Sequence, residues 1–242
     1  MGTRSIVVLL LAAVVTLAVL SLLQPFRIFV PGLLEGAWMT ARIAALGSLF
    51  AVVCGVTAAL LRLYAPLPLR CLARIYIEVF RGTSALVQLF WLFFVLPDFG
   101  ISLDPFTVAV LTLGLNVGAY GAEVVRGAIQ SVPRGQWEAG TALNMTRAQM
   151  LRRIILPQAV VPMIPPWGNL FIELLKATAL VSLITITDLA FKAQEMNQTT
   201  LKTVDIFTLV LLIYLAMSLI LTIGMRALEK AASRGLARGR AA

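Results

Sequence analysis

The sequence predicts an all-α fold, a bundle of helices that span a membrane. Of its 242 residues, 60% are hydrophobic and only 13% are charged, and the mean hydropathy is +0.94. Soluble domains contain about 45–50% apolar and about 25% charged residues, so this composition belongs to the membrane class. The apolar residues also gather in runs of about 20, the length that a helix needs to cross roughly 30 Å of hydrocarbon. One polytopic membrane domain is the simplest organisation.

Six apolar segments follow one another along the chain. The first begins after Arg4 and is followed by no small-residue cleavage site, so we expect a retained span rather than a signal peptide. The fifth contains Pro165, Pro166, Glu173 and Lys176, which make it a poor lipid-facing helix. The sixth is the most uniformly apolar. The six predicted spans are Ile6–Leu23, Leu33–Leu61, Leu72–Leu96, Phe106–Ile129, Pro162–Leu189 and Ile206–Met225.

The positions of lysine and arginine predict the orientation, because short cytoplasmic loops carry an excess of both. With the N-terminus in the cytoplasm, fourteen of the twenty basic residues fall on the cytoplasmic side and three, Arg27, Lys192 and Lys202, fall on the other. Both termini are therefore expected in the cytoplasm. The net charge of +9 does not indicate a nucleic-acid partner, since the charges lie in short gaps between spans rather than on one basic face.

The residues needed for most catalytic chemistry are missing from the sequence. It contains no histidine, and its two cysteines, Cys54 and Cys71, are far apart and form no metal-binding spacing. We therefore predict no catalytic, cofactor-binding or metal-ligating residues, and a membrane-embedded enzyme is disfavoured. The phosphate-binding pattern G-x-x-x-x-G-K-[ST] is also absent, so the chain is not expected to hydrolyse ATP by that route.

A charged stretch between the fourth and fifth spans, residues 134–157, predicts two short helices with a bend between them. Thr146 and Gln149 form a capping box that would open the second helix. Asn144, just before it, tolerates the left-handed conformation that a tight break between helices needs. Pro157 is expected to end the regular hydrogen-bond ladder of the second helix. A DNA-reading helix-turn-helix is disfavoured by the spans that flank this stretch on both sides.

The same stretch resembles the EAA motif of bacterial ABC importer permeases. That motif reads roughly E-A-A, three residues, G, nine variable residues, then L-P. Two positions depart from it: Gly140 replaces the third residue and Asn144 replaces the usual glycine. Four residues match: Glu138, Ala139, Leu156 and Pro157.

Further segments resemble the polar-amino-acid branch of that family. Phe80–Thr83 and Gln88 are similar to its F-R-G-T-P-x-x-x-Q signature, with Ser84 where proline is usual. Residues 128–133 resemble the entry to its loop, and Asn169–Ser182 resembles its N-x-F-I-x-L-L-K-x-T-S-L-V-S segment.

The resemblance covers about residues 33–226, and the segment after Thr187 is similar to ectoine and hydroxyectoine permeases. It implies three parts: an extra N-terminal span (1–27), a type I ABC importer permease core (28–226) that includes the loop 134–157, and a basic cytoplasmic tail (227–242).

The implied function is that of the transmembrane permease subunit of an ATP-driven importer in the bacterial inner membrane. Polar amino acids or related zwitterionic compatible solutes such as ectoine are the implied substrates. The implied partners are separate ABC ATPase subunits that bind the ATP, an extracytoplasmic solute-binding protein, and a second permease, with a heterodimer preferred to a homodimer. The residues implied to couple the permease to the ATPase are Glu138, Ala139, Gly140, Asn144, Leu156 and Pro157.

Polar residues within the spans are candidates for the translocation path, because ionisable groups are costly in hydrocarbon and usually face protein or water. Glu78 and Arg81 share a helix face, as a structural ion pair or as a gate. Asn116 is either a hydrogen-bonding link between helices or a ligand for a substrate carboxylate, and the glycines near it are expected to permit close helix packing. The fifth span, which its prolines are expected to interrupt, would also line the path. The full set of candidates is Glu78, Arg81, Gln88, Asn116, Glu123, Asn169, Glu173 and Lys176.

One other class of protein remains open on the sequence alone. The charges within the spans could instead serve an ion-coupled secondary transporter or a channel. Uptake by such a protein would survive loss of any ATPase and would collapse with the proton or sodium gradient.

Overall fold

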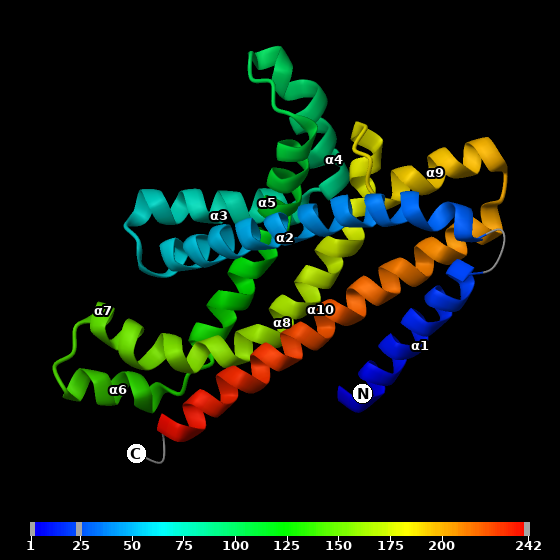
Figure 1. The fold of residues 1–242 in the computed structure, drawn as a ribbon. Helices are drawn as coiled ribbons and strands as arrows, with labels where there is room; N and C mark the ends of the chain where they lie inside the picture. Colours follow the sequence, from blue (N-terminus) through cyan, green and yellow to red (C-terminus); the bar gives the residue numbers. More distant parts are fainter. Residues whose placement is uncertain (1–2, 23–25, 240–242) are drawn as a thin grey trace.

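The computed structural model describes residues 3–22 and 26–239, which are almost entirely helical and contain no strand (Figure 1). The predicted all-α class is therefore confirmed. Leu23, at the end of the first predicted span, and Arg240, in the predicted tail, lie outside the described residues. The helices are α1 (Thr3–Leu22), α2 (Phe26–Tyr64), α3 (Leu67–Gly82), α4 (Ala85–Phe90), η1 (Trp91–Val95), η2 (Leu96–Phe99), α5 (Pro105–Gln130), α6 (Arg134–Ala142), α7 (Arg147–Met150), η3 (Leu151–Ile155), α8 (Leu156–Ala177), η4 (Thr178–Ile184), α9 (Leu189–Thr200) and α10 (Thr203–Gly239).

Four helical stretches of the described chain are long and apolar enough to cross a membrane: Phe26–Tyr64, Pro105–Gln130, Arg147–Ile184 and Thr203–Ser233. A fifth span is possible if α3 and the helices that follow it count as one bent unit. Within α1, the apolar helix found among the residues whose side chains are described runs over Ile6–Leu17. Four to five spans are thus supported, while the sixth span and the cytoplasmic position of the termini stay predictions.

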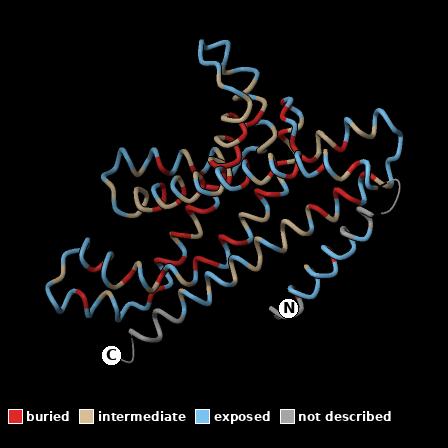
Figure 2. The backbone as a smooth tube through the Cα atoms, in the orientation of Figure 1, coloured by how far each residue is buried: buried red, intermediate tan, exposed pale blue. Residues whose placement is uncertain are grey.

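The main core lies where α2 crosses α5 and α8. Small residues let these helices approach closely: a Cβ atom on Gly55 would lie 2.8 Å from the carbonyl oxygen of Gly118, and one on Gly118 would lie 3.0 Å from the carbonyl oxygen of Ala51. The prediction that the glycines near Asn116 permit helix packing is confirmed. Figure 2 shows the buried residues gathered along these crossings, whereas most of the described side chains of α1 are exposed.

The predicted span Leu72–Leu96 is not one helix. It breaks after Gly82, and α3 and the following helices meet at 108°. Thr83 and Ser84 have extended backbones, with ψ of 153° and 135°, which ends α3 and lets Ser84 begin α4. The third predicted span is therefore possible only as one bent unit.

The fifth predicted span was expected to be broken by its prolines, but the structure shows a continuous helix there. Its prolines do not interrupt it, because α8 continues through Pro162, Pro165 and Pro166. All three prolines are exposed, whereas Met163 and Trp167 on the other face are buried. Packing of the buried face maintains the helix despite the hydrogen bonds that proline cannot donate. The break comes later, at Thr178, where the chain tightens into the 3₁₀ helix η4.

Candidate functional site

Residues 134–157 form two short helices with a sharp turn between them, as predicted. The first is α6, and the second begins as α7 and continues into η3 (lower left of Figure 1). Asn144 adopts the left-handed conformation, with φ of 53°. The turn is closed by backbone hydrogen bonds, in which Met145 N donates to Gly140 O at 3.1 Å. Asn144 therefore adopts the left-handed conformation at the position where the motif has glycine.

The predicted capping box is present at the start of α7. The Thr146 hydroxyl accepts a hydrogen bond from Gln149 N at 3.3 Å, and the Gln149 side-chain oxygen accepts one from Thr146 N at 2.9 Å. Two backbone donors that a helix start leaves without partners are thereby satisfied. The second helix of the pair begins at a fixed residue for this reason.

Gly140 is buried against Met150, across the pair of helices. A Cβ atom at position 140 would lie 2.9 Å from both Cε and Cγ of Met150. Glycine in place of the third motif residue therefore lets α6 and α7 approach more closely than alanine would without a shift of the methionine. This close contact accounts for the departure from the motif in physical terms.

Pro157 does not end the second helix. The chain forms one π-helical turn, η3, and then resumes as α8 at Leu156, with Pro157 in its first turn. A π-type turn widens the helix just before a residue that lacks an N–H donor, which explains how the proline is accommodated. The double helix is thus continuous with a span, and Glu138, Ala139 and Asn144 remain exposed on its surface.

A second polar network surrounds the break between α3 and α4. The Gln88 side-chain nitrogen donates to Phe80 O at 3.0 Å and to the Thr83 hydroxyl at 2.6 Å. From α5, the Asn116 nitrogen donates to Phe80 O at 2.9 Å and to the Gln88 side-chain oxygen at 3.2 Å. Asn116 therefore links helices in this conformation, and the segment Phe80–Thr83 is a bend that both amides hold.

A charged cluster centres on Glu123, in the part of α5 that leads to residues 134–157. Its carboxylate receives a hydrogen bond from Arg62, pairs with Arg126 Nε at 2.7 Å, and lies 3.5 Å from Arg81 Nη1. The Arg81 guanidinium also lies over the Tyr120 ring, 5.4 Å from its centroid. Three arginines around one carboxylate leave two excess positive charges in a partly exposed cluster that joins α2, α3 and α5.

Of the two roles considered for Glu78 and Arg81, the structural ion pair does not form among the described residues, and the role as a gate stays a prediction. Arg81 forms an ion pair with Glu123, and Glu78 is exposed on α3. Two members of the cluster were not among the predicted site residues. Arg126 lies three positions after Glu123, a helical spacing that could have indicated it. Arg62 comes from another helix, and no spacing in the sequence indicates that contact.

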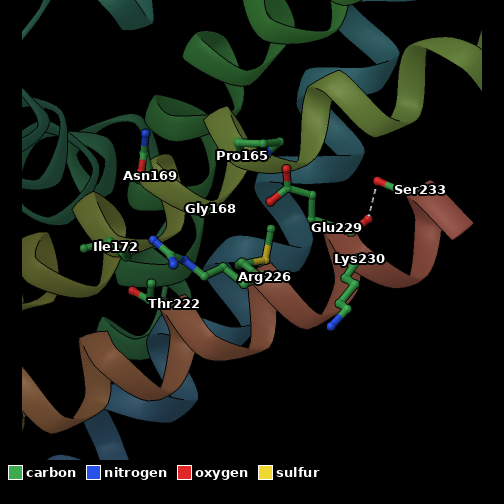
Figure 3. A pocket seen from close by; sticks show the side chains of 10 residues that line it. Pro165, Gly168, Asn169, Ile172, Thr222, Arg226, Glu229, Lys230 and Ser233 are labelled. Atoms are coloured by element: carbon green, nitrogen blue, oxygen red, sulfur yellow. Dashed lines mark hydrogen bonds between the residues drawn. The ribbon is translucent and has the colours of Figure 1, made fainter. Parts of the chain in front are cut away.

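A cleft of about 530 Å³ opens between α8 and α10, near the C-terminal part of α10. Asn169 lies on its α8 wall, and Arg226 and Glu229 reach from α10 toward α8, while Lys230 points away (Figure 3). Glu173 lies one helical turn beyond Asn169 and is exposed, as is Lys176. No ion pair joins Glu173 to Lys176 in the described structure.

Of the predicted path residues, the structure thus brings together two pairs, Gln88 with Asn116 and Arg81 with Glu123. Asn169, Glu173 and Lys176 lie along α8, and Glu78 stands apart on α3.

Comparison with known proteins places the chain in one family. Residues 47–234 match the family model described as "Binding-protein-dependent transport system inner membrane component". The L-cystine transport system permease protein TcyB of Bacillus subtilis is 44% identical over 169 residues, which cover 70% of this chain and 72% of that protein. The glutamine transport system permease protein GlnP of Escherichia coli is 38% identical over 203 residues, covering 83% of this chain and 93% of that protein.

Solved structures agree with the sequence matches. The crystal structure of an amino acid ABC transporter with histidines has a chain that superposes with a TM-score of 0.78 at 35% identity, covering 84% of this chain and 95% of that one. An inward-facing structure of the methionine ABC transporter MetNI superposes with a TM-score of 0.71 at 19% identity, covering 83% of this chain and 96% of that one, and supports the fold alone. The chain therefore belongs to the family of binding-protein-dependent transport system inner membrane components, the ABC permeases, which are transport subunits without an ATPase site of their own.

Proposed function

We propose that this permease imports an amino acid or a related zwitterionic solute such as ectoine. The observation that carries the proposal is the extent of its similarity to permeases of known substrate class, 38–44% identity over most of the chain. Those relatives are permeases for L-cystine and glutamine, and the matching crystal structure is of an amino acid transporter. Nothing in the comparisons favours an ion-coupled transporter or a channel.

The path would run past the cleft between α8 and α10. Three charged side chains line this cleft: Arg226 and Glu229 reach toward α8, where the amide of Asn169 lies, while Lys230 points away. A zwitterion presents a carboxylate and an ammonium group, so the charges of Arg226 and Glu229 are complementary to it. Glu173 and Lys176 would continue the polar lining along α8, and the cluster around Glu123 would fix α2, α3 and α5 beside the path.

Residues 134–157 would form the contact with the ATPase. Glu138 and Ala139 are exposed on a double helix whose turn and start are fixed by hydrogen bonds. Because the second helix continues directly into α8, a displacement of the double helix would be transmitted to the helix that lines the cleft. Such a continuous element is what a partner's ATP-driven closure needs in order to alter the path.

The wider assembly is part of the same proposal. A second permease, a different chain in preference to a second copy, would complete the path, and a solute-binding protein would deliver substrate from outside. The extra span 1–27 and the tail 227–242 would flank the core 28–226, with both termini in the cytoplasm. ATP would be bound by the partner, so the permease itself would need no cofactor.

Replacement of Glu138 by arginine tests the coupling assignment. We expect Glu138→Arg to abolish co-purification of the ATPase partner, because the change reverses the charge on the exposed face of α6. Glu35→Arg is the matched control, since Glu35 is also exposed but lies near the start of α2. If the Glu138→Arg permease still binds the ATPase and still supports ATP-driven uptake, the assignment is wrong.

A further inference from the structure

The packing of α3 against the core fixes which side chains this helix presents outward. α3 lies side by side with the second part of α2 and also contacts α5 (Figure 1). Ala73 and Ile77, four positions apart, are buried on the packed face. Between them, the Tyr76 hydroxyl donates to Leu115 O of α5 at 2.7 Å. The rotation of α3 about its own axis is therefore set, and the rest of its circumference faces outward.

One outward face of α3 is apolar. Leu72, Ile75 and Val79 follow one another at helical spacings of three and four residues, and each is more than half exposed. Large apolar side chains that are exposed in a row mark a surface that interacts with a membrane or with another protein. Because α3 belongs to the membrane domain, the acyl chains of lipids are suited to cover this face.

The adjoining outward face of α3 is basic. Arg70, Arg74 and Arg81 lie within about 40° of one another around the helix axis, at about 100° per residue. The Arg70 Nη2 donates to Ala65 O at 3.2 Å, which holds that guanidinium beside the turn between α2 and α3. Glu78, the one acidic residue of α3, lies next to the arginines. Arg74 and Glu78 are both exposed, and neither forms an ion pair or hydrogen bond within the described structure.

The basic face continues into the cluster around Glu123. Arg81 belongs to both, because its Nη1 lies 3.5 Å from the Glu123 carboxylate while its side chain remains partly exposed. Arg62 and Arg126 pair with the same carboxylate and are also partly exposed. Five arginines and two carboxylates thus occupy this surface, so that it carries three excess positive charges.

We propose that the basic face of α3 binds the headgroup of an anionic phospholipid whose acyl chains lie on the apolar face. A guanidinium binds phosphate oxygens through charge-assisted hydrogen bonds, often two at once. Helices that bind anionic membrane surfaces combine a basic face with an apolar one in this way. Arg74 makes no contact of this kind within the described structure, so its guanidinium is available to the phosphate.

Both faces together favour a lipid over the other ligands that either face would accept. A free phosphate ion would use the arginines and leave the apolar face exposed. A second permease would cover the apolar face without needing the arginines. In the predicted orientation, the turn between α2 and α3 lies at the cytoplasmic surface, so the lipid would belong to the cytoplasmic leaflet. The inference does not depend on which solute the permease imports.

Binding of two lipids that differ only in the headgroup tests the proposal. The permease, purified with its ATPase partner in detergent, is titrated with dioleoylphosphatidylglycerol or dioleoylphosphatidylcholine, and bound lipid is counted by native mass spectrometry. Arg74→Gln should weaken binding of phosphatidylglycerol about fivefold, the effect of one basic residue near an anionic surface, and leave phosphatidylcholine unchanged. Glu78→Gln should act in the opposite direction and strengthen it by a similar factor. Arg27→Gln, at an exposed arginine at the other end of α2, is the matched control and should change neither.

Two further measurements separate a lipid from the other ligands. Inorganic phosphate should not displace phosphatidylglycerol, and Ile75→Ser should weaken the binding of both lipids, because it removes apolar contact with the acyl chains. The proposal is overturned if Arg74→Gln affects phosphatidylglycerol no more than Arg27→Gln does, or if Glu78→Gln fails to strengthen its binding. Displacement of the lipid by inorganic phosphate would show an ion site instead. If Ile75→Ser leaves lipid binding unchanged but releases a second permease, the apolar face is a protein interface and the assignment is wrong.

Discussion

The stability of this permease should fall as the pH rises through about 6, because of a single buried carboxyl. Asp188 is 0% exposed, and burial raises its pKa from 3.8 to about 6. A carboxyl with a raised pKa in the folded state stabilises the fold below its unfolded pKa and loses that contribution as the pH rises through the folded value. The window for this effect is therefore about pH 4 to pH 7.

The magnitude follows from the size of the shift. A rise of about two pKa units corresponds to about 3 kcal/mol, which is an upper bound for a group that still caps a helix. Asp188→Asn removes the charge and keeps the oxygen that accepts from Phe191 N. The variant should therefore match the wild type near pH 4 and exceed it at pH 7.5, by about 6–12 °C at most on the scale of domains of this size.

Thermal unfolding of the purified permease in detergent, measured at pH 4, 5, 6 and 7.5, checks this expectation. The quantity to follow is the difference in melting temperature between variant and wild type, since other carboxyls titrate equally in both. Asp98→Asn, at an exposed carboxyl, is the control and should give a difference that does not vary with pH. A constant difference for Asp188→Asn, or one that shrinks as the pH rises, would refute the reasoning.

Three further substitutions test the contacts of the site, each read as a melting temperature. Gly140→Val should destabilise the double helix by about 1–3 kcal/mol, because its side chain would overlap Met150, and Met150→Ala should relieve that loss. Gln88→Leu should cost about 1–3 kcal/mol by leaving polar partners at the bend unsatisfied, whereas Gln198→Leu, at an exposed glutamine, should be neutral. Glu123→Gln should cost a similar amount, since three arginines would lose their common anion.

Each of these has a result that counts against it. If Met150→Ala fails to restore Gly140→Val, overlap with that methionine is not the cause. If Gln88→Leu and Gln198→Leu are equally harmless, the amide does not hold the bend. An unchanged or higher melting temperature for Glu123→Gln would mean that the arginines repel no more strongly without the carboxylate.

Local sequence patterns predicted the double helix well. The capping box at Thr146 and the left-handed Asn144 depend on interactions within a few residues, so the chain encodes them locally. The contact between Gly140 and Met150 depends on how two helices pack, which the spacing alone did not reveal. The motif therefore predicted where the helices begin and turn, but not why glycine stands at position 140.

Interactions between distant residues account for what was missed. The break after Gly82 is held by a hydrogen bond from Asn116, which belongs to another helix. Arg81 pairs with Glu123, which lies 42 positions further along the chain, and not with Glu78 on its own helix. The prolines of α8 locally disfavour a helix, yet α8 continues through them because Trp167 and its neighbours are packed on the other face. In a helical membrane protein, such contacts between spans decide where a helix bends.

The central claim is that a separate ATPase drives uptake through this permease. The most direct measurement is uptake of labelled L-glutamine, L-cystine, L-histidine and ectoine into proteoliposomes that contain the permease with its ATPase and solute-binding protein. We predict that at least one of these solutes accumulates only with ATP present, and that a proton or sodium ionophore leaves its uptake unchanged. Uptake that persists without the ATPase and collapses with the ion gradient would contradict this account.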